Sequence, residues 1–329
     1  MRVAIVGFGK MGLLHAGILN VMPKVDLVGV CEANSFTRRM FKKVLRDVPF
    51  FADVGELLDL NVDAVFVTTP ISSHFAVAKR VYEDRLACHL FIEKPLTSSF
   101  ADSKLLSNLA NKNGGVNMVG YLRRFMVTFS KARELLSAGS IGELESFRIN
   151  AFSSDFYGLK EDSKITLARG GVLADLGSYA IDLILWFFGD LQLISAKGGA
   201  LNSLGVENEV HFEVVRKSDS LLGEAFVSWQ KEGYRMPEVI LSVKGSKGTI
   251  EVNDDRVNLN LSNGNNFIWY RPNLNDTVKF WLAAPEYFRE DECFFNSIRG
   301  DLIAEPNFEA AAKTDELIGL IKKQVENNA

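Results

Sequence analysis

The sequence brings an acid and a base together in the stretch Phe91-Ile92-Glu93-Lys94-Pro95. The apolar residues before Glu93 predict the end of a buried strand, and the proline after Lys94 cannot continue a ladder. In an open parallel sheet, ligands bind at the carboxyl ends of the strands, so this position suits chemistry. A lysine partly shielded from water there can have its pKa lowered and can transfer a proton. The alternative is an exposed Glu-Lys pair before a turn, which is the usual state of charged pairs.

A second group of polar residues lies on a helix that the sequence predicts over residues 173–188. Asp175, Tyr179 and Asp182 are spaced i, i+4 and i+7, so they should share one face of that helix. The apolar residues of another face are expected in the core, and they are Leu173, Leu176, Ala180, Leu183 and Phe187. The polar stripe therefore either lines a site or forms an ordinary solvated face.

A glycine turn follows the first predicted strand and reads Gly7-Phe8-Gly9-Lys10-Met11-Gly12. This is the spacing of a dinucleotide fingerprint between a strand and a helix. Gly7 would allow the tight turn, Gly9 the approach of a pyrophosphate, and Gly12 the close packing of helix on strand. The phosphates would lie at the helix N-terminus, where backbone N–H groups and the helix dipole favour anions. The alternative is the glycine turn of another nucleotide fold or of an S-adenosylmethionine fold.

Two further positions at strand ends suit the same cofactor. Glu32 ends the second predicted strand, 20 residues after Gly12. A carboxylate there can accept hydrogen bonds from both ribose hydroxyls of NAD and would repel the 2′-phosphate of NADP. We therefore expect NAD as the cofactor, with NADP as the alternative. Thr69 and Pro70 end another strand, and His74 lies in the first turn of the next helix, where a nicotinamide would lie. A lone histidine such as His74 is nevertheless more often structural than catalytic.

These residues need a scaffold, and the pattern of the chain predicts one in two parts. Up to residue 121, strands alternate with helices, which indicates an α/β domain with a parallel sheet and right-handed crossovers. Its strands are predicted at 3–6, 25–30, 64–68, 88–92 and 116–119. From about residue 191 onward, strands follow one another with turn signals, which indicates an open, mostly antiparallel sheet in a second, α+β domain. We place the domains at 1–120 and 121–329, with helices near 285–299 and 308–325.

Composition narrows the function classes. The chain is 47% hydrophobic and 24% charged, with a net charge of −4, so it lacks the basic footprint of a nucleic-acid-binding protein. Its three cysteines are far apart, which argues against a disulfide framework and suits a reducing compartment, so we expect a cytoplasmic protein. The four histidines show no metal-ligand spacing, and we expect no metal. The N-terminus opens into a strand rather than a signal peptide, and no apolar run is long enough to cross a membrane.

The order and spacing of five motifs resemble one family. They are the glycine turn at 7–12, Glu93-Lys94-Pro95, Arg123-Arg124-Phe125, Gly142-Glu143 before a strand, and Gly-Gly-x-x-x-Asp-x-Gly-x-x-x-x-Asp over residues 170–182. This is the glucose–fructose oxidoreductase/inositol dehydrogenase/rhizopine-catabolism family, often called Gfo/Idh/MocA. The resemblance covers essentially the whole chain. It implies an N-terminal Rossmann domain with a doubly wound parallel sheet, a C-terminal domain with an open sheet, and bound NAD or NADP.

The resemblance also implies a reaction and roles. A secondary alcohol of a sugar, nucleotide-sugar or polyol would give hydride to the cofactor, or the corresponding ketone would be reduced. Tyr179 would be the acid/base, Lys94 would bind the reacting oxygen and tune Tyr179, and Asp175 would orient that group. Glu93 would fix Lys94 or contact the cofactor, and Arg123 or Arg124 would help to hold cofactor or substrate.

The chain departs from the family pattern at Tyr179, where most members have histidine. The dimeric dihydrodiol dehydrogenases, glucose–fructose oxidoreductase and certain sugar 3-ketoreductases are similar to this chain in carrying tyrosine there. A phenol can still exchange a proton with an alcohol, although its ordinary pKa near 10 needs a neighbouring cation. The departure weakens the expectation of an inositol-type substrate. The alternatives are a trans-dihydrodiol-type dehydrogenase, a dinucleotide sensor without turnover, and a methyltransferase.

The resemblance also implies association through the second sheet, as a homodimer or homotetramer. The strands of the second domain are rich in β-branched and aromatic residues, and examples are Phe212, Val214, Val215, Phe226, Val227 and Trp229. An open sheet this apolar should not leave one face to water. We expect no nucleic acid and no membrane among the partners.

Overall fold

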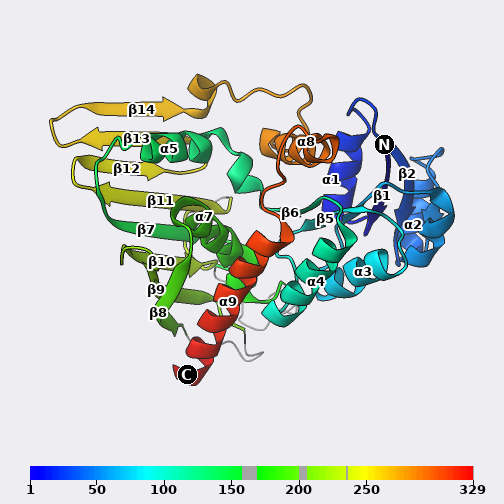
Figure 1. Cartoon of the computed structure of the whole chain (residues 1–329), viewed down its shortest axis with the longest axis horizontal. Coiled ribbons are helices and arrows are strands. Elements are labelled where there is room, and N and C mark those ends of the chain that lie inside the picture. Colours follow the sequence, from blue (N-terminus) through cyan, green and yellow to red (C-terminus); the bar gives the residue numbers. More distant parts are fainter. Residues whose placement is uncertain (158–168, 200–205, 235, 329) are drawn as a thin grey trace. The chain divides into compact units, whose positions relative to one another are not determined.

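The computed structural model describes residues 1–157, 169–199, 206–234 and 236–328 (Figure 1). The chain forms two compact units, of which the first comprises Met1–Leu122 and Val278–Asp315, and the second Arg123–Thr277 and Glu316–Ala329. The first unit thus also contains the late segment 278–315, which the sequence analysis placed with the second domain. The domain bounds 1–120 and 121–329 remain a prediction.

The first unit is built on a six-stranded sheet with the strand order β3-β2-β1-β4-β5-β6, and every neighbouring pair is parallel. The strands are β1 (Arg2–Val6), β2 (Asp26–Cys31), β3 (Phe50–Phe51), β4 (Ala64–Val67), β5 (His89–Glu93) and β6 (Asn117–Gly120). The parallel sheet predicted from the sequence is therefore confirmed. The strand order reverses between β1 and β4, and such a switch point is where ligands bind in open α/β sheets.

Helices cover both faces of this sheet. They are α1 (Lys10–Leu19), α2 (Ser35–Lys42), α3 (Ile71–Glu83), α4 (Phe100–Asn113) and α8 (Pro285–Arg299), with the 3₁₀ turn η1 (Val54–Leu60). Figure 1 shows α1 beside α8 on one face, and α3 beside α4 on the other. Because both faces are covered, β4 is buried at every position, and Phe66 stacks on Phe91 with ring centroids 4.6 Å apart.

The second unit is built on an eight-stranded sheet with the order β14-β13-β12-β11-β7-β10-β9-β8. The strands are β7 (Leu144–Phe152), β8 (Leu191–Gly198), β9 (Glu209–Arg216), β10 (Leu222–Ser228), β11 (Glu238–Gly245), β12 (Gly248–Val252), β13 (Arg256–Leu261) and β14 (Asn266–Tyr270). Only β7 and β10 pair in parallel among these strands. The mostly antiparallel second sheet is therefore also confirmed.

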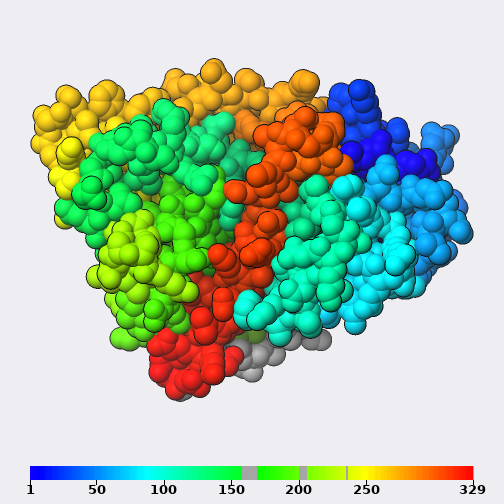
Figure 2. All heavy atoms as spheres, viewed as in Figure 1, coloured from blue at the N-terminus to red at the C-terminus, as the bar shows by residue number. Residues whose placement is uncertain are grey.

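Helices lie on one face of the second sheet. The helix α5 (Val127–Ser137) contacts β12 and β13, and α7 (Ser178–Phe188) contacts β7. The last helix, α9 (Phe308–Asn328), begins in the first unit, and its later part belongs to the second. In the space-filling view, α5 and α9 form much of the visible surface over this sheet (Figure 2). Short 3₁₀ turns are found at η2 (Leu122–Phe125) and η4 (Arg271–Leu274).

Most of the apolar residues from which an association surface on the second sheet was predicted belong to the core of this unit. Phe212, Val214, Val227 and Trp229 are buried within the chain, so they cannot form the surface on which association was argued. The other side of the sheet carries ion pairs, for example Arg148–Glu224 and Lys244–Glu145, together with the ring of Phe226. The oligomer through this sheet therefore stays a prediction, without that apolar support.

The helix predicted over residues 173–188 has two parts. Leu173–Gly177 form a π-helical turn, η3, and the α-helix α7 begins only at Ser178. A π-turn contains more residues than an α-helical turn, so Asp175 and Tyr179 lie in two different kinds of helix. Four of the five predicted core residues are buried, whereas Phe187 is partly exposed. Asp182 is buried whereas Asp175 and Tyr179 are partly exposed, and the expectation that all three share one face stays a prediction.

Two absences apply to the described parts of the chain. No helix there combines the length and the apolar character that a membrane crossing needs. No cluster of three or more His, Cys, Asp or Glu side chains that could hold a metal ion is found among those same residues.

Candidate functional site

The glycine turn joins β1 to α1 and packs against the end of β4. Gly7 has a φ of 93°, and a Cβ at this position would lie 2.8 Å from the backbone nitrogen of Thr69. A Cβ on Gly12 would overlap the carbonyl oxygen of Gly7, so both glycines are required by close backbone contact. Gly9 has open space where its Cβ would point, and it is the N-cap of α1 without any side-chain capping bond. The N-terminus of α1 can therefore receive an anion.

Glu32 follows β2 and faces the same turn. Its Oε2 accepts a hydrogen bond from the backbone N–H of Phe8 at 2.7 Å, and its Oε1 accepts one from Asn34 at 2.7 Å. A carboxylate has about four lone-pair sites, so two backbone bonds leave room for hydroxyl donors. The guanidinium of Arg38 donates to the carbonyl oxygens of Glu32 and Ala33 at 2.6 and 2.7 Å. One carboxylate and one cation thus lie at the end of β2.

His74 joins the ends of β4 and β5. It is buried in the first turn of α3, with Nε2 2.8 Å from the carbonyl oxygen of Thr69 and Nδ1 3.0 Å from that of Pro95. Burial lowers the pKa of His74, so a neutral ring would donate to one of the two carbonyls. Its described contacts are structural, and they fix the backbone next to Lys94 rather than expose the ring to a cofactor.

Glu93, the last residue of β5, lies in a buried cluster that the sequence analysis missed. The ring of His15 on α1 lies between two carboxylates, with Nε2 3.0 Å from Glu93 Oε1 and Nδ1 2.9 Å from Asp291 Oδ1 on α8. The other oxygen of Glu93 accepts a hydrogen bond from the backbone N–H of Lys94 at 3.3 Å. Glu93 therefore contacts the backbone of Lys94, and its role in a functional site stays a prediction.

The loop after Lys94 has a second buried anchor. Asp315 on α9 accepts hydrogen bonds from the backbone N–H of Thr97 at 3.2 Å and from the hydroxyl of Ser103 at 2.6 Å. Burial raises the pKa of Asp315 to about 7. The peptide bond between Lys94 and Pro95 is cis. Lys94 thus begins a loop that α1, α3, α8 and α9 hold from several sides.

In the second unit, Asp175 lies in the π-turn η3. Its carboxylate accepts a hydrogen bond from Arg169 at 3.0 Å, and Arg169 also donates to Asp155 at 2.7 Å. Glu207 is buried and accepts a hydrogen bond from the backbone N–H of Leu173 at 3.2 Å, at the start of the turn. A π-turn is a frequent feature of functional sites.

Tyr179 lies one turn later, at the start of α7, and is partly exposed. The guanidinium of Arg123 lies over its ring, 4.7 Å from the centroid. Arg123 is held by two hydrogen bonds to Asp254, at 3.0 and 3.2 Å, and by one to the carbonyl oxygen of Pro237. Arg123 is therefore a cation in direct contact with the Tyr179 ring.

Asp182 does not share the surroundings of Asp175 and Tyr179. It is buried and accepts two hydrogen bonds from Arg124, at 2.7 and 2.8 Å. Such a bidentate pair is a rigid structural link between η2 and α7. Arg124 is therefore occupied in the core, and Arg123 is the only one of the two arginines beside a proposed site residue in this part of the chain.

Sequence spacing offered a signal for some of these residues and not for others. The run Arg123-Arg124 drew attention to both arginines, but nothing in it distinguishes the one that stacks on a ring from the one that is buried. Asp291 follows His15 by 276 residues, so no local pattern could pair them. A histidine three residues after the third glycine of the fingerprint is the one clue that the sequence contained.

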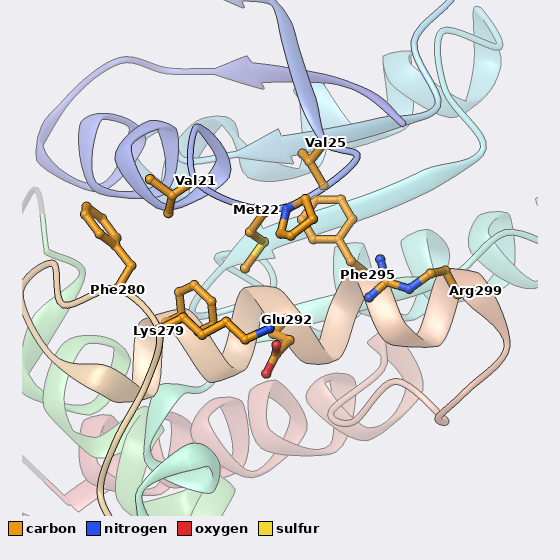
Figure 3. Close-up of a pocket in the computed structure, with 10 residues that line it drawn as sticks. Val21, Met22, Val25, Lys279, Phe280, Glu292, Phe295 and Arg299 are labelled. Carbon is orange, nitrogen blue, oxygen red and sulfur yellow. The ribbon is translucent and has the colours of Figure 1, made fainter.

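The first unit also has a cavity away from these residues. It measures about 240 Å³ and lies between the α1–β2 connection and α8 (Figure 3). Val21, Met22 and Val25 line one side, and Glu292 and Arg299 line the other. Its described lining contains none of the residues proposed above for cofactor or catalysis.

Two family models match the chain. One is described as an oxidoreductase family with an NAD-binding Rossmann fold and matches residues 1–121, and the other is the GFO/IDH/MocA C-terminal domain, matching residues 129–251. Among solved structures, levoglucosan dehydrogenase in complex with NADH and levoglucosan is similar, with a TM-score of 0.86 at 17% identity. The match covers 100% of this chain and 98% of that one, and at this identity it shows the fold.

Curated relatives are similar over part of their length. The chain is 27% identical over 206 residues to scyllo-inositol 2-dehydrogenase (NAD(+)) of Bacillus subtilis (strain 168), and 26% identical over 224 residues to Myo-inositol 2-dehydrogenase of Thermotoga maritima. The matches cover 62% and 65% of this chain, and 58% and 64% of those proteins. The two-sheet fold, the glycine turn and both family models together identify the chain as a member of the Gfo/Idh/MocA family of oxidoreductases.

Proposed function

We propose that the protein is an NAD-dependent dehydrogenase or reductase that acts on a secondary alcohol or ketone of a sugar, nucleotide-sugar or polyol. The observation that carries this proposal is the carboxyl edge of the first sheet. There the glycine turn follows β1, Glu32 follows β2, and Lys94 follows β5. A dinucleotide turn and a basic residue on one edge suit hydride transfer coupled to proton transfer. The inositol dehydrogenases among the relatives support the substrate class.

The residues of this edge fit a dinucleotide. The uncapped N-terminus of α1 suits the pyrophosphate, and the open space at Gly9 admits it. We propose that Gly7, Phe8, Gly9, Lys10, Met11 and Gly12 form the phosphate loop, while Glu32 takes the ribose hydroxyls. Thr69 and Pro70 would flank the nicotinamide, with His74 fixing their backbone. Bound NAD supplies the hydride acceptor at C4 of its nicotinamide ring.

Three side chains would handle the proton. In alcohol oxidation, Tyr179 as the phenolate would take the proton of the substrate hydroxyl and become the phenol, and the Lys94 ammonium would donate a hydrogen bond to the reacting oxygen of the substrate. Asp175, which is fixed by Arg169, would orient the phenol of Tyr179. The family resemblance implies that Lys94 tunes the pKa of Tyr179. We now propose that Arg123 shares this role, because its guanidinium lies over the ring and favours negative charge there.

A binding experiment tests the cofactor before any substrate is known. Fluorescence titrations with NADH, NADPH and S-adenosylmethionine should show that NADH binds most tightly. Glu32→Ser should narrow the gap between NADH and NADPH, because it removes the carboxylate that repels the 2′-phosphate. Tighter binding of NADPH by the unaltered protein would mean that Arg38 dominates at the end of β2. Binding of S-adenosylmethionine alone would replace the proposal with a methyltransferase.

A substrate screen then tests the reaction. Sugars, polyols, keto-sugars and trans-dihydrodiols are offered with both cofactors, and the change in NADH absorbance is followed. Lys94→Met should keep NADH binding and lose turnover by at least about 100-fold, the usual contribution of an acid–base group. The matched control is Lys79→Met, because Lys79 is a partly exposed lysine on α3 that pairs with Glu83. Near-normal turnover by Lys94→Met would remove Lys94 from the reaction.

A further inference from the structure

His15 has an unusual place for a histidine that no proposed reaction step uses. It is 0% exposed, and it lies on α1, the helix that follows the glycine turn. Both ring nitrogens face carboxylates, because Nδ1 lies 2.9 Å from both oxygens of Asp291 and Nε2 lies 3.0 Å from Glu93. The rings of Phe66, Phe91 and Tyr287 surround the imidazole. A polar group in this setting needs its hydrogen bonds, because a fully buried ring is shielded from bulk solvent.

The geometry decides which form of the ring fits. A neutral imidazole has one N–H donor and one lone pair, so one of the two carboxylates would face the lone pair. The imidazolium has two N–H donors and serves both carboxylates at once. Burial alone would lower the pKa of His15, but the adjacent charges of Asp291 and Glu93 outweigh it and raise that pKa well above 6.5. Asp291 and Glu93 are the charged groups that act on the ring from α8 and β5.

The cluster acts on Lys94 through Glu93. One carboxylate oxygen of Glu93 is bound to His15, and the other accepts the backbone N–H of Lys94. The carboxylate is thereby fixed at both oxygens, and the first peptide of the lysine loop is tied to α1. Since α1 also carries the proposed phosphate-binding turn, one side chain connects the turn to the strand end that carries the lysine.

We propose that His15 is a positioning residue, which as an imidazolium locks Glu93 and thereby holds Lys94 in register with the cofactor-binding helix. This inference rests on the proposed function for its effect on turnover, and on the cluster alone for the charge of His15. A displacement of about 1 Å at a reacting group can reduce a rate by about 100-fold, so loss of this lock should be visible in kcat.

The charge of His15 is tested on the unaltered protein by NMR with nitrogen-15-labelled histidine. At about pH 8, both ring nitrogens of His15 should carry protons, while an ordinary histidine is neutral there. His89 is the internal control, because it lies on the same strand as Glu93, its Nδ1 accepts the backbone N–H of Val116, and burial lowers its pKa. A neutral His15 ring at this pH would overturn the inference, whatever reaction the protein catalyses.

The positioning role is tested by variants of the cluster. His15→Gln should lower kcat by about 10-fold to 100-fold while NADH affinity changes little, because the phosphate turn itself is intact. Its amide N–H should still serve one carboxylate, and the backbone amide signal of Lys94 should shift. His89→Gln, the matched control at the other end of β5, should leave both kcat and the Lys94 signal unchanged. Equal kcat in His15→Gln and the unaltered protein would overturn the positioning role.

A pH profile separates positioning from simple support of the fold. Asp291→Asn keeps the shape of the cluster but removes one charge, so His15 should lose its proton at a pH lower by about one unit or more. The fall of kcat on the alkaline side should move to lower pH accordingly. A uniform loss at every pH would show mere structural support and would overturn the proposal. NADH binding without turnover on any substrate would defeat the proposed function, while the NMR result would still decide the charge of His15.

Discussion

The backbone around Lys94 is anchored by groups that exchange protons, whereas the surroundings of Tyr179 are anchored by guanidinium groups that stay charged. At the end of β5, the anchors are His15 with its two carboxylates, His74, and Asp315, whose pKa is about 7. Around Tyr179, the anchors are Arg123 with Asp254 and Arg124 with Asp182. We therefore expect the geometry around Lys94 to depend on pH through its histidines, and the geometry around Tyr179 to depend on pH only through buried carboxyl groups such as Asp182, whose pKa is raised by burial.

The largest effect should come from breaking the buried ion pair of Arg124 and Asp182. Asp182→Ala would leave the guanidinium of Arg124 buried without its partner, which costs about 3–5 kcal/mol of unfolding free energy. Urea unfolding measures it. The double variant Arg124→Met/Asp182→Leu should recover much of the loss, because it removes both buried charges.

The control for this prediction is an exposed pair in the same unit. Arg148→Ala removes the partner of Glu224 at the surface and should change the unfolding free energy by less than about 1 kcal/mol. If Asp182→Ala were as stable as Arg148→Ala, the guanidinium anchor would not be what holds α7.

The second-largest effect concerns catalysis by Tyr179, whose ring lies beside the Arg123 guanidinium. Tyr179→Phe keeps the ring under Arg123 but removes the transferable proton, so turnover should fall by at least about 100-fold. Folding and NADH binding should survive, because the lost hydrogen bond contributes only about 1 kcal/mol. Steady-state rates and a NADH titration measure both.

Tyr179→His sharpens the same prediction. An imidazole can exchange the same proton with a pKa nearer neutrality, so part of the activity should return with a pH profile moved to lower pH. Normal turnover by Tyr179→Phe would make the tyrosine a packing residue and leave proton transfer to Lys94 or to water.

The third effect is the pH dependence of stability that the titratable anchors should cause. The pKa of His15 is raised in the folded protein, so its stabilisation is complete below about pH 6.5 and is lost as the pH rises through the raised value. Each unit of pKa shift corresponds to about 1.4 kcal/mol. The free energy of unfolding of the unaltered protein, measured with urea, should therefore decrease toward alkaline pH. The His15→Gln variant should lack this part of the decrease.

Asp315 gives a separate window with the same sign. Its folded pKa of about 7 exceeds the ordinary 3.8, so its contribution declines as the pH rises between those two values and then stays constant. Asp315→Asn should remove the pH dependence of the unfolding free energy only within this acidic window. His15→Gln should remove it only at higher pH. A stability that falls equally at alkaline pH in His15→Gln and in the unaltered protein would contradict the comparison.

The smallest effect should come from the cation over the Tyr179 ring. Arg123→Lys keeps a charge but loses the flat guanidinium and its paired bonds to Asp254, so turnover should fall several-fold, which corresponds to about 1 kcal/mol. Arg133→Lys is the matched control, because Arg133 lies over Trp186 at 4.5 Å, away from the proposed site. Equal losses in the two variants would mean that Arg123 supports the fold and not Tyr179.

The sequence alone determined the elements and the edges on which the proposed residues lie. Periodicity predicted the parallel sheet and the mostly antiparallel sheet, because burial on one or both faces leaves a repeat along the chain. The glycine turn was readable because backbone contact demands glycine at fixed positions, as Gly7 and Gly12 show.

Tertiary structure alone decided the partners. A local repeat cannot signal that Leu173–Gly177 form a π-turn rather than the first turn of an α-helix, because that choice depends on how the turn packs. Nor can it show that Arg124 goes to Asp182 while Arg123 goes to the Tyr179 ring. His15 meets Asp291 across 276 residues, and only the folding of α8 against α1 brings the charges of that cluster together. Long-range pairs of this kind leave no spacing in the sequence, because what fixes them is the packing of whole elements.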